Sequence, residues 1–352
     1  MNESLIWGNF GTSYELEARI RITARLKPIE IARSLCVKLF VCILSLIVGV
    51  SLSGCSQPDE GIINVGTNIW PGYEPLYLAK NRELFDTKGV RFVEFTAASE
   101  VLRAYRNKTI DVAALTLDEA LFLIQDQPDT KIILVMDFSA GADVVIAQQY
   151  IGDLSELSGK RVGLESSALG AFVWARAMDI HAPELTDVKI INMEFNRHER
   201  AFLNQEVDVV VTFEPVKSQL IEAGGKVLFS SKEIPGEIVD VLVARESLID
   251  RHPSQLSNLV NGWFAGLKFL NDEKTQALQE MGGRLKMDQE ALAAAYDGMI
   301  LLGREENKQL LSGEPPNILS TGRKVENLLL KSGLLYKEVL TENVIDSRFL
   351  SQ

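Results

Sequence analysis

Two parts of the chain follow the same plan at a fixed spacing. The pair Val65-Gly66 ends an apolar run and opens a loop, and Val162-Gly163 does the same 97 residues later. The runs Ile110-Asp111-Val112 and Val207-Asp208-Val209 are also 97 residues apart. Two matched anchors at one offset predict two similar lobes rather than one continuous sheet, with chance recurrence of common strand dipeptides as the alternative.

Short β-branched runs alternate with helical patterns, which predicts an α/β fold in which each lobe is a doubly wound, mostly parallel sheet flanked by helices. The expected strands are residues 62–66, 90–95, 110–115, 131–136, 143–147, 160–164, 188–192, 207–212, 226–229 and 238–244. Apolar periodicity predicts helices at residues 99–107, 168–180, 254–270, 288–302 and 322–332.

The first 60 residues have the pattern of an export signal. The apolar stretch 39–52 follows basic residues and is shorter than the ~20 residues that span a bilayer. It ends in Leu52-Ser53-Gly54-Cys55, which resembles the bacterial lipobox. We therefore expect residues 1–54 to be a signal peptide, Cys55 to be lipidated, and 55–60 to be a tether. A membrane anchor or a buried helix is the alternative.

Composition limits the classes of function that this chain can have. Close to half of it, 46%, is hydrophobic, enough for a large core. Beyond residue 54 the net charge is −14, which argues against nucleic acid or an anionic membrane surface as a partner. No cysteine follows Cys55, so a disulfide, a thiolate metal site and a cysteine nucleophile are excluded there. No catalytic or cofactor motif stands out, so we expect no enzyme activity, cofactor or metal.

In doubly wound sheets, ligands bind beyond the carboxyl ends of the strands, and two facing lobes would form a ligand cleft there. The candidate ligand-binding residues at these ends are Asn68, Trp70, Tyr73, Glu74, Thr116, Asp118, Asp137, Ser139, Asp143, Glu165, Ser166, Ser167, Phe213 and Glu214. Several have structural alternatives: Glu74, Asp118 and Glu214 are also candidate helix caps. His181, His198 and His252 lack metal-ligand spacing and are expected on the surface or in loops.

The charge of these loops indicates the kind of solute. Six acids lie at strand ends without Arg or Lys beside them, and such acids would repel an enclosed anion. This favours a solute with an amine or a protonatable heteroaromatic ring, including a zwitterion. The small residues from Ser166 to Gly170 lead into a helix and would instead suit an anionic group.

Four runs carry a resemblance to a known family: residues 65–79 (VGTNIWPGYEPLYLA), 137–143 (DFSAGAD), 157–163 (LSGKRVG) and 212–215 (TFEP). They resemble bacterial solute-binding proteins of ABC importers, in the group for nitrate, sulfonates, taurine or the pyrimidine precursor of thiamine. The resemblance implies the type II periplasmic-binding-protein fold, whose chain crosses twice between lobes. We place the crossings near residues 149–153 and 233–237, which gives lobe 1 as 61–149 plus 238–340 and lobe 2 as 153–234.

The resemblance also implies a function. A monomeric, lipid-anchored protein on the periplasmic face of a bacterial membrane would capture a small solute, close its lobes and deliver the solute to importer permease subunits. Ser56, rather than aspartate, after the cysteine leaves the outer membrane open as the site of anchoring. The alternative is a sensor that presents its solute to a membrane receptor kinase. A eukaryotic pyrimidine synthase shares the fold but uses a cysteine-rich motif that this chain lacks.

Overall fold

The computed structural model describes residues 61–166 and 169–351, which lie in one compact unit, Gly61–Gln352. The expected signal peptide, the tether, Cys55 and Ser167 lie outside the described residues. Within the described part, no helix combines the length and the apolar character needed to cross a membrane.

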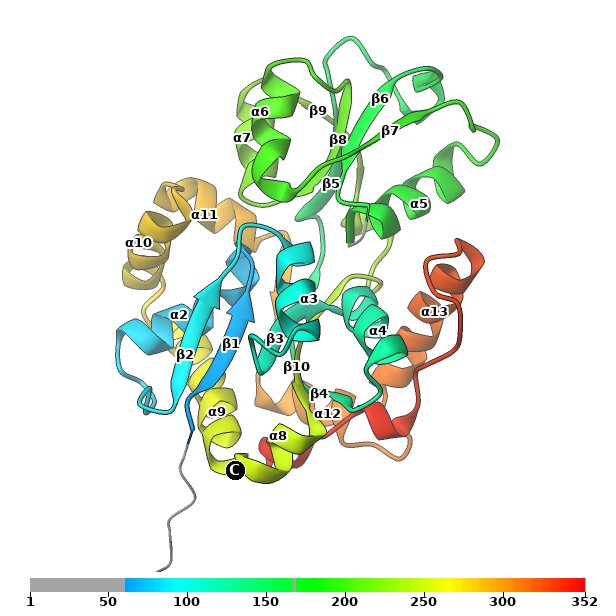
Figure 1. Ribbon diagram of the computed structural model, residues 1–352. Coiled ribbons are helices and arrows are strands. Elements are labelled where there is room, and N and C mark those ends of the chain that lie inside the picture. Colours follow the sequence, from blue (N-terminus) through cyan, green and yellow to red (C-terminus); the bar gives the residue numbers. More distant parts are fainter. Residues whose placement is uncertain (1–60, 167–168, 352) are drawn as a thin grey trace, which may run out of the picture. The chain divides into compact units, whose positions relative to one another are not determined.

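The first sheet has six strands in the order β11-β4-β10-β3-β1-β2. Their bounds are β1 Ile63–Thr67, β2 Val90–Glu94, β3 Val112–Thr116, β4 Thr130–Ser139, β10 Val239–Arg245 and β11 Met299–Leu301. Strand β1 pairs in parallel with β2 and β3, whereas β10 lies antiparallel between β3 and β4. Helices flank this sheet in the lower half of Figure 1.

The second sheet has five strands in the order β7-β6-β8-β5-β9. Their bounds are β5 Asp143–Ala147, β6 Arg161–Leu164, β7 Lys189–Asn192, β8 Val209–Phe213 and β9 Lys226–Ser230. Here β6 pairs in parallel with β7 and β8, and β5 lies antiparallel between β8 and β9. This sheet forms the upper lobe of Figure 1. The two sheets confirm the expected division into lobes.

The internal repeat is visible in hydrogen bonds. In the first lobe the Asp111 carboxylate accepts from the backbone N–H of Asn64 at 2.8 Å. At the same positions of the second lobe, the Asp208 carboxylate accepts from the backbone N–H of Arg161 at 2.8 Å. Each aspartate stands just before a strand and ties it to the start of its parallel neighbour. Both aspartates therefore have a structural role.

The first crossing between the lobes differs from the expected one. Strand β5 belongs to the second sheet, so the chain crosses at residues 140–142 and not near 149–153. The end of the first segment of lobe 1 at residue 149 was therefore wrong. A strand's sequence does not show which sheet it joins. Gly141, with φ +127°, makes the turn, and its N–H donates to Ser231 Oγ at 2.6 Å. Ser231 lies in the return crossing, so one side chain links both crossings.

The helices follow the expected pattern with one exception. Their bounds are α2 Glu74–Asn81, α3 Ala98–Arg106, α4 Leu117–Asp126, α5 Leu169–His181, α6 His198–Leu203, α7 Val216–Glu222, α8 Glu246–Arg251, α9 Pro253–Asp272, α10 Lys274–Leu285, α11 Gln289–Tyr296, α12 Arg304–Leu311 and α13 Ile318–Lys331. The helix expected over 288–302 ends at Tyr296. Residues 299–301 instead form β11, which pairs with the end of β4.

The C-terminal segment was expected to pack on lobe 1 alone, and most of it does. Helix α9 packs on α2, and Ile345 bridges to Ile132 of β4. Helix α13 packs on α4 of lobe 1, yet Lys331 Nζ also lies 3.2 Å from Asp179 Oδ1 of α5 in lobe 2. One hydrophobic cluster includes side chains of α4, α5 and α13. The last helix therefore contacts both lobes.

Candidate functional site

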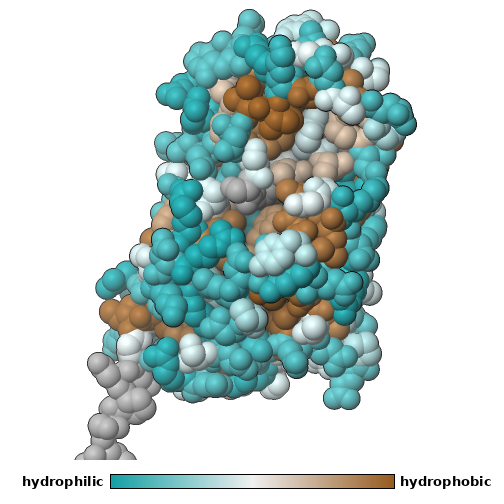
Figure 2. Space-filling view, turned by 45° about the vertical axis from the view of Figure 1, so that its right-hand side comes forward, coloured by the Kyte–Doolittle hydropathy of each residue, from teal (hydrophilic) through white to brown (hydrophobic). Residues whose placement is uncertain are grey.

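A cavity lies where the two lobes meet, at one end of both sheets. Its volume is about 30 Å³, room for one or two waters. Figure 2 shows apolar side chains gathered around the hollow between the upper and lower parts of one face. The lining comes from both lobes: Asn68, Trp70, Tyr73, Ala98, Thr116, Glu119, Asp143, Glu165, Leu169, Gly170, Val173, His198, Val211, Thr212, Phe213 and Asp240.

The directions of the strands explain why the lining residues lie close together. Parallel strands bring their carboxyl ends to one edge, and the loop after β1, Thr116 of β3, Glu165 after β6 and Phe213 of β8 lie there. The reversed strands β5 and β10 bring their first residues to the same edge. Asp143 and Asp240 therefore join the site from the starts of these strands.

One wall of the cavity is aromatic. The Trp70 and Phe213 rings meet edge to face with centroids 5.7 Å apart, and Phe195 stacks on Phe213 at 4.2 Å. Trp70 Nε1 donates to Asp137 Oδ2 at 3.2 Å, which fixes the indole. Gly72 lets the loop pass over this bond, since a Cβ there would lie 2.2 Å from each of the two bonded atoms. The wall is thus held before any solute binds.

Beside the aromatic wall lies a group of buried carboxyls. Tyr73 donates its hydroxyl proton to Asp240 Oδ1 at 2.5 Å. Burial, reinforced by the charge of Asp137, raises the pKa of Asp240 well above its usual range. Burial likewise raises the pKa of Asp137 to about 7, although the Trp70 hydrogen bond opposes the shift. Both groups therefore hold protons more tightly than surface aspartates do.

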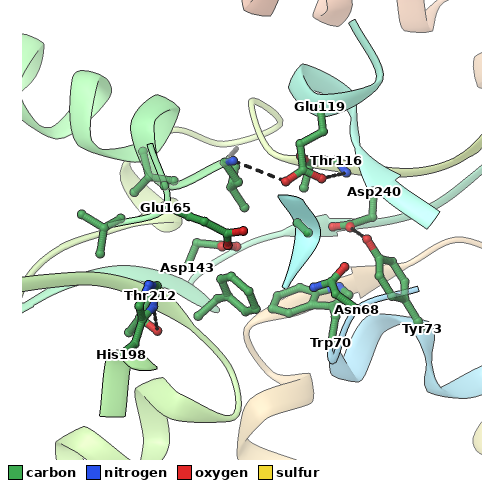
Figure 3. A pocket seen from close by; sticks show the side chains of 16 residues that line it. Asn68, Trp70, Tyr73, Thr116, Glu119, Asp143, Glu165, His198, Thr212 and Asp240 are labelled. Atoms are coloured by element: carbon green, nitrogen blue, oxygen red, sulfur yellow. Dashed lines mark hydrogen bonds between the residues drawn. The ribbon is translucent and has the colours of Figure 1, made fainter. Parts of the chain in front are cut away.

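Two carboxyls reach across the junction in opposite directions (Figure 3). Glu119 of lobe 1 accepts from Leu169 N at 3.4 Å, at the start of α5. Glu165 of lobe 2 accepts from Ser99 N at 3.0 Å, in the first turn of α3. Burial is the main reason why the pKa of Glu119 rises to about 8 and that of Glu165 to about 7. Each lobe thus places a carboxyl on a helix start of the other lobe.

Among the acids of the cavity lining, Asp143 has a carboxylate oxygen that is not used inside the described part of the protein. Its Oδ2 is buried and has no hydrogen-bond partner among the described residues. Burial raises its pKa to about 7, with a hydrogen bond from Ser139 acting in the opposite direction. Within the described residues the cavity lining contains no Lys or Arg. The site therefore offers a cation an unused acceptor, and the nearby positive charge that acts on Asp143, Lys217, lies outside the lining.

His198 was expected on the surface or in a loop. It is instead a buried residue at the start of α6 and part of the cavity lining. Its Nε2 lies 3.3 Å from the Met193 carbonyl, and its Nδ1 lies 3.2 Å from Thr212 Oγ1. Desolvation lowers the pKa of His198 to about 4, so the ring is neutral near pH 7. A neutral ring adds no positive charge to the cavity and holds the Thr212 hydroxyl in place.

Of the fourteen candidate residues, seven line the cavity: Asn68, Trp70, Tyr73, Thr116, Asp143, Glu165 and Phe213. Ser167 falls outside the described residues. The other six lie outside the lining and have internal roles. Glu74 bonds Arg284 Nε at 2.9 Å, and Glu214 accepts from Ser218 N at 3.1 Å, near the start of α7.

The remaining four support the site or lie beside it. Asp137 holds Trp70, and Ser139 Oγ bonds Ser231 Oγ at 2.8 Å between the crossings. The backbone N–H of Ser166 donates to Asn192 Oδ1 at 2.9 Å. Asp118 is buried in the first turn of α4, but Thr116 is the N-cap and forms a capping box with Glu119. The expectation that Asp118 is the cap was wrong.

Sequence reasoning missed four polar residues of the lining as ligand-binding candidates: Glu119, His198, Thr212 and Asp240. A capping-box pattern, Thr116 followed three residues later by Glu119, was readable but indicates a helix start, not a ligand site. Asp240 is the second residue of β10, and the strand-end rule considers only the carboxyl ends of strands. Separately, the described residues contain no group of three or more His, Cys, Asp or Glu placed to hold a metal ion.

Solved structures define the class of fold. The alkanesulfonate-binding protein SsuA from Xanthomonas axonopodis pv. citri, bound to MOPS, is similar with TM-score 0.69 and 14% identity, over 82% of this chain and 98% of that one. A ligand-binding component of an ABC-type import system from Staphylococcus aureus, with zinc bound, has TM-score 0.69 and 15% identity, over 83% and 98%. The Escherichia coli aliphatic sulphonate-binding protein SsuA has TM-score 0.63 and 15% identity, over 79% and 89%.

The fold is therefore that of the periplasmic solute-binding components of ABC importers. The model of the NMT1-like family matches residues 56–283, more than half of the chain. The chain belongs to this family, which confirms the resemblance found in its loops. No curated protein matches the chain significantly in sequence.

Proposed function

We propose that this chain is an extracytoplasmic solute-binding protein that captures a small organic cation, an amine or a protonated heteroaromatic ring, and delivers it to an ABC importer. The observation that carries the proposal is the character of the cavity. Glu119, Asp143, Glu165 and Asp240 line it beside an aromatic wall, and its described lining holds no basic side chain. The protein binds without turnover.

Electrostatics supports a cation over an anion. At an effective dielectric constant of 20, two like charges 4 Å apart repel by ~4 kcal/mol. Where these carboxyls are ionised, an enclosed sulfonate or nitrate would meet several like charges and no basic side chain of the described lining. A cation would be attracted by the same carboxyls and by the faces of Trp70 and Phe213. The likeness to sulfonate-binding proteins therefore supports the fold and not the choice of solute.

Capture requires lobe movement, because a cavity of about 30 Å³ is too small to admit an organic solute. Opening would break the bonds of Glu119 and Glu165 to the opposite lobe. A solute that contacts both lobes would restore closure through its own contacts. The permease subunits would then recognise the closed form.

The location follows from the N-terminal segment. In this proposal, signal peptidase removes residues 1–54 and acyl chains on Cys55 hold a monomer at the bacterial membrane. Residues 56–60 are the link to the fold. Mass spectrometry of the membrane-fraction protein would detect an acylated Cys55, and an intact N-terminus at Met1 would contradict this part of the proposal.

A thermal-shift screen of the purified protein against amines, aminopyrimidines, alkanesulfonates and nitrate tests the solute class. The expected result is that stabilisation comes from amines or protonated heteroaromatics and is weakened in Trp70→Ala and Glu165→Ala. Stabilisation by sulfonates or nitrate alone would refute the cation. Turnover of the bound solute would refute a pure binding role.

A further inference from the structure

We infer that the bound cation contacts this protein through several N–H groups, so that it is a primary ammonium, amidinium or guanidinium and not a quaternary ammonium. The inference rests on the proposed function, because it presupposes a cationic solute. It concerns hydrogen-bond direction, a property separate from charge. The observation is that the polar atoms left for a ligand are mainly acceptors.

The acceptors come from three carboxyls on both lobes, because both oxygens of the fourth lining acid, Glu119, already accept from backbone N–H groups. Asp143 Oδ2 is buried without a partner among the described residues. Glu165 uses Oε1 for Ser99 N, and Asp240 uses Oδ1 for the Tyr73 hydroxyl. Each of these two carboxyls also hydrogen-bonds another carboxyl, Glu165 with Glu194 and Asp240 with Asp137, so Asp143 Oδ2 is the acceptor without a partner and the other two are shared. Ionised carboxylates accept only, so their remaining capacity requires a donor from the ligand.

Most donors at the cavity are already used inside the protein, and the Thr116 hydroxyl and one N–H of the Asn68 amide are the exceptions. Trp70 Nε1 donates to Asp137, and the Tyr73 hydroxyl donates to Asp240. The backbone N–H groups of Ser99 and Leu169 donate to Glu165 and Glu119. Figure 3 shows the Tyr73–Asp240 and Leu169–Glu119 bonds within the group of lining side chains. One backbone N–H at the start of each of the helices α3 and α5 is thereby bonded to one of the protein's own carboxyls.

His198 sets the direction of the Thr212 hydroxyl. The Met193 carbonyl can only accept, so the imidazole nitrogen facing it, Nε2, must carry the hydrogen. In a neutral ring Nδ1 is then an acceptor, and the Thr212 hydroxyl donates to it. Thr212 Oγ1 consequently has only its lone pairs to offer to the cavity.

Two lining side chains remain, and both can accept. Asn68 Nδ2 lies 3.4 Å from the Ile69 carbonyl, which leaves Asn68 Oδ1 as the freer end of the amide. Thr116 is a hydroxyl that can act in either direction. A quaternary ammonium brings charge but no hydrogen-bond donor, so closure over it would leave these acceptors buried and unpaired. Sites built around hydrogen bonds discriminate strongly against analogues that cannot form them.

Matched small cations separate the effect of the ligand's charge from the effect of its hydrogen-bond donors. Guanidinium, methylammonium and tetramethylammonium chlorides would be titrated into the purified protein at constant ionic strength, with Trp fluorescence and thermal shift as readouts. We expect guanidinium or methylammonium to bind at least about tenfold tighter than tetramethylammonium. Equal or tighter binding of tetramethylammonium, or no binding of either donor cation, would overturn the inference. Binding of ethanesulfonate alone would overturn the proposed function itself.

Thr212→Val tests the residue-level argument, with Thr67→Val as the matched buried control. Thr67 Oγ1 bonds Tyr77 OH at 2.6 Å and does not line the cavity. We expect Thr212→Val to reduce the preference for guanidinium over tetramethylammonium at least about fivefold, and Thr67→Val to leave it unchanged. An unchanged preference in Thr212→Val would contradict the argument.

A further test uses the unmodified protein, so its result does not depend on whether a variant folds. Nitrogen-15 NMR of His198 should show Nε2 protonated and Nδ1 unprotonated at pH 7. A hydrogen on Nδ1 would mean that Thr212 accepts from the ring and has a hydroxyl proton to offer the ligand. That result would overturn the inference.

Discussion

Asp143 shows how a single carboxyl can be kept available for a ligand. As the first residue of a reversed strand, it enters the cavity beside the crossing between lobes. Its partner-free oxygen is costly in the unliganded protein, because a buried acceptor has lost water without gaining a bond. A bound cation would remove that cost. In the proposed function, the residue would therefore contribute to binding more than to folding.

Asp143→Asn should weaken cation binding at least about tenfold, since one full charge–charge contact is lost. The unfolding free energy at pH 8 should not fall, because the substitution also removes an uncompensated buried charge. Calorimetric titration and chemical denaturation measure the two effects. Retained affinity together with a large loss of stability would show that Asp143 is structural.

The same substitution at Asp111 provides a matched control. Asp111 accepts from Asn64 N and Asn64 Nδ2, far from the cavity lining. We expect Asp111→Asn to reduce stability by about 1 kcal/mol and to leave cation affinity unchanged.

At the residue scale, the strand-end rule found part of the lining, although Thr212, at the end of an expected strand, was missed and Asp143 was found on a reversed strand. Trp70, Glu165 and Phe213 follow or end parallel strands, and the structure places them in the lining. Asp240 enters because β10 is reversed, and no local pattern reports strand direction. Glu74 and Glu214 obey the same rule but bond Arg284 and Ser218 instead.

Among elements, α10 is joined to α2 and β2 of the first lobe by Arg284, in addition to its apolar contacts. Arg284 bonds Glu74 of α2, pairs with Glu94 of β2 and places its guanidinium 3.5 Å from the Tyr77 ring centroid. Glu74 is buried, and desolvation raises its pKa to about 7 against the opposing effect of Arg284. The pair therefore matters mainly because Glu74 would otherwise be a buried charge without a partner.

Arg284→Met should lower the unfolding free energy by about 3 kcal/mol, as expected when one partner of a buried pair is removed. Arg82→Met is the control from the neighbourhood, since Arg82 pairs with the more exposed Glu280 and should contribute no more than about 1 kcal/mol. Urea denaturation would measure the unfolding free energy of both variants. Equal losses in the two variants would contradict the role assigned to Glu74 burial.

The elements themselves were largely predictable, because each strand is a local β-branched run and each helix has a local apolar period. The prediction failed where the structure of a segment depends on the strand with which it pairs. Residues 299–301 form a strand only because the end of β4 offers an edge. Strand β5 was assigned to the wrong lobe because its run of apolar residues fits either sheet equally well.

On the scale of the whole molecule, the carboxyls that gather between the lobes link stability to pH. Burial raises the pKa of Glu119 to about 8 and those of Asp143 and Glu165 to about 7. The unfolded chain would release these protons near pH 4. Between pH 4 and pH 8 the folded state therefore binds more protons than the unfolded state, and stability must fall as pH rises.

Without solute, the melting temperature should decrease by several degrees, on the order of 5 °C, from pH 6.5 to pH 8.5. His198, whose pKa is lowered to about 4, opposes this decrease only at the lower end of the window, because the unfolded imidazole is about half protonated at pH 6.5 and neutral by about pH 7.5. Differential scanning calorimetry measures how the melting temperature changes with pH, and this change should be smaller in Asp143→Asn. A melting temperature that rises over this window would refute the assigned protonation.

The most direct test of the proposed cationic clamp is calorimetric titration of the best-binding organic cation near pH 7, in two buffers with different ionisation enthalpies. A cation that settles among partly protonated carboxyls must displace protons. We predict one solute per chain, net proton release, and affinity that increases from pH 6 to pH 8. Proton uptake, or measurable binding for anions alone, would contradict the account.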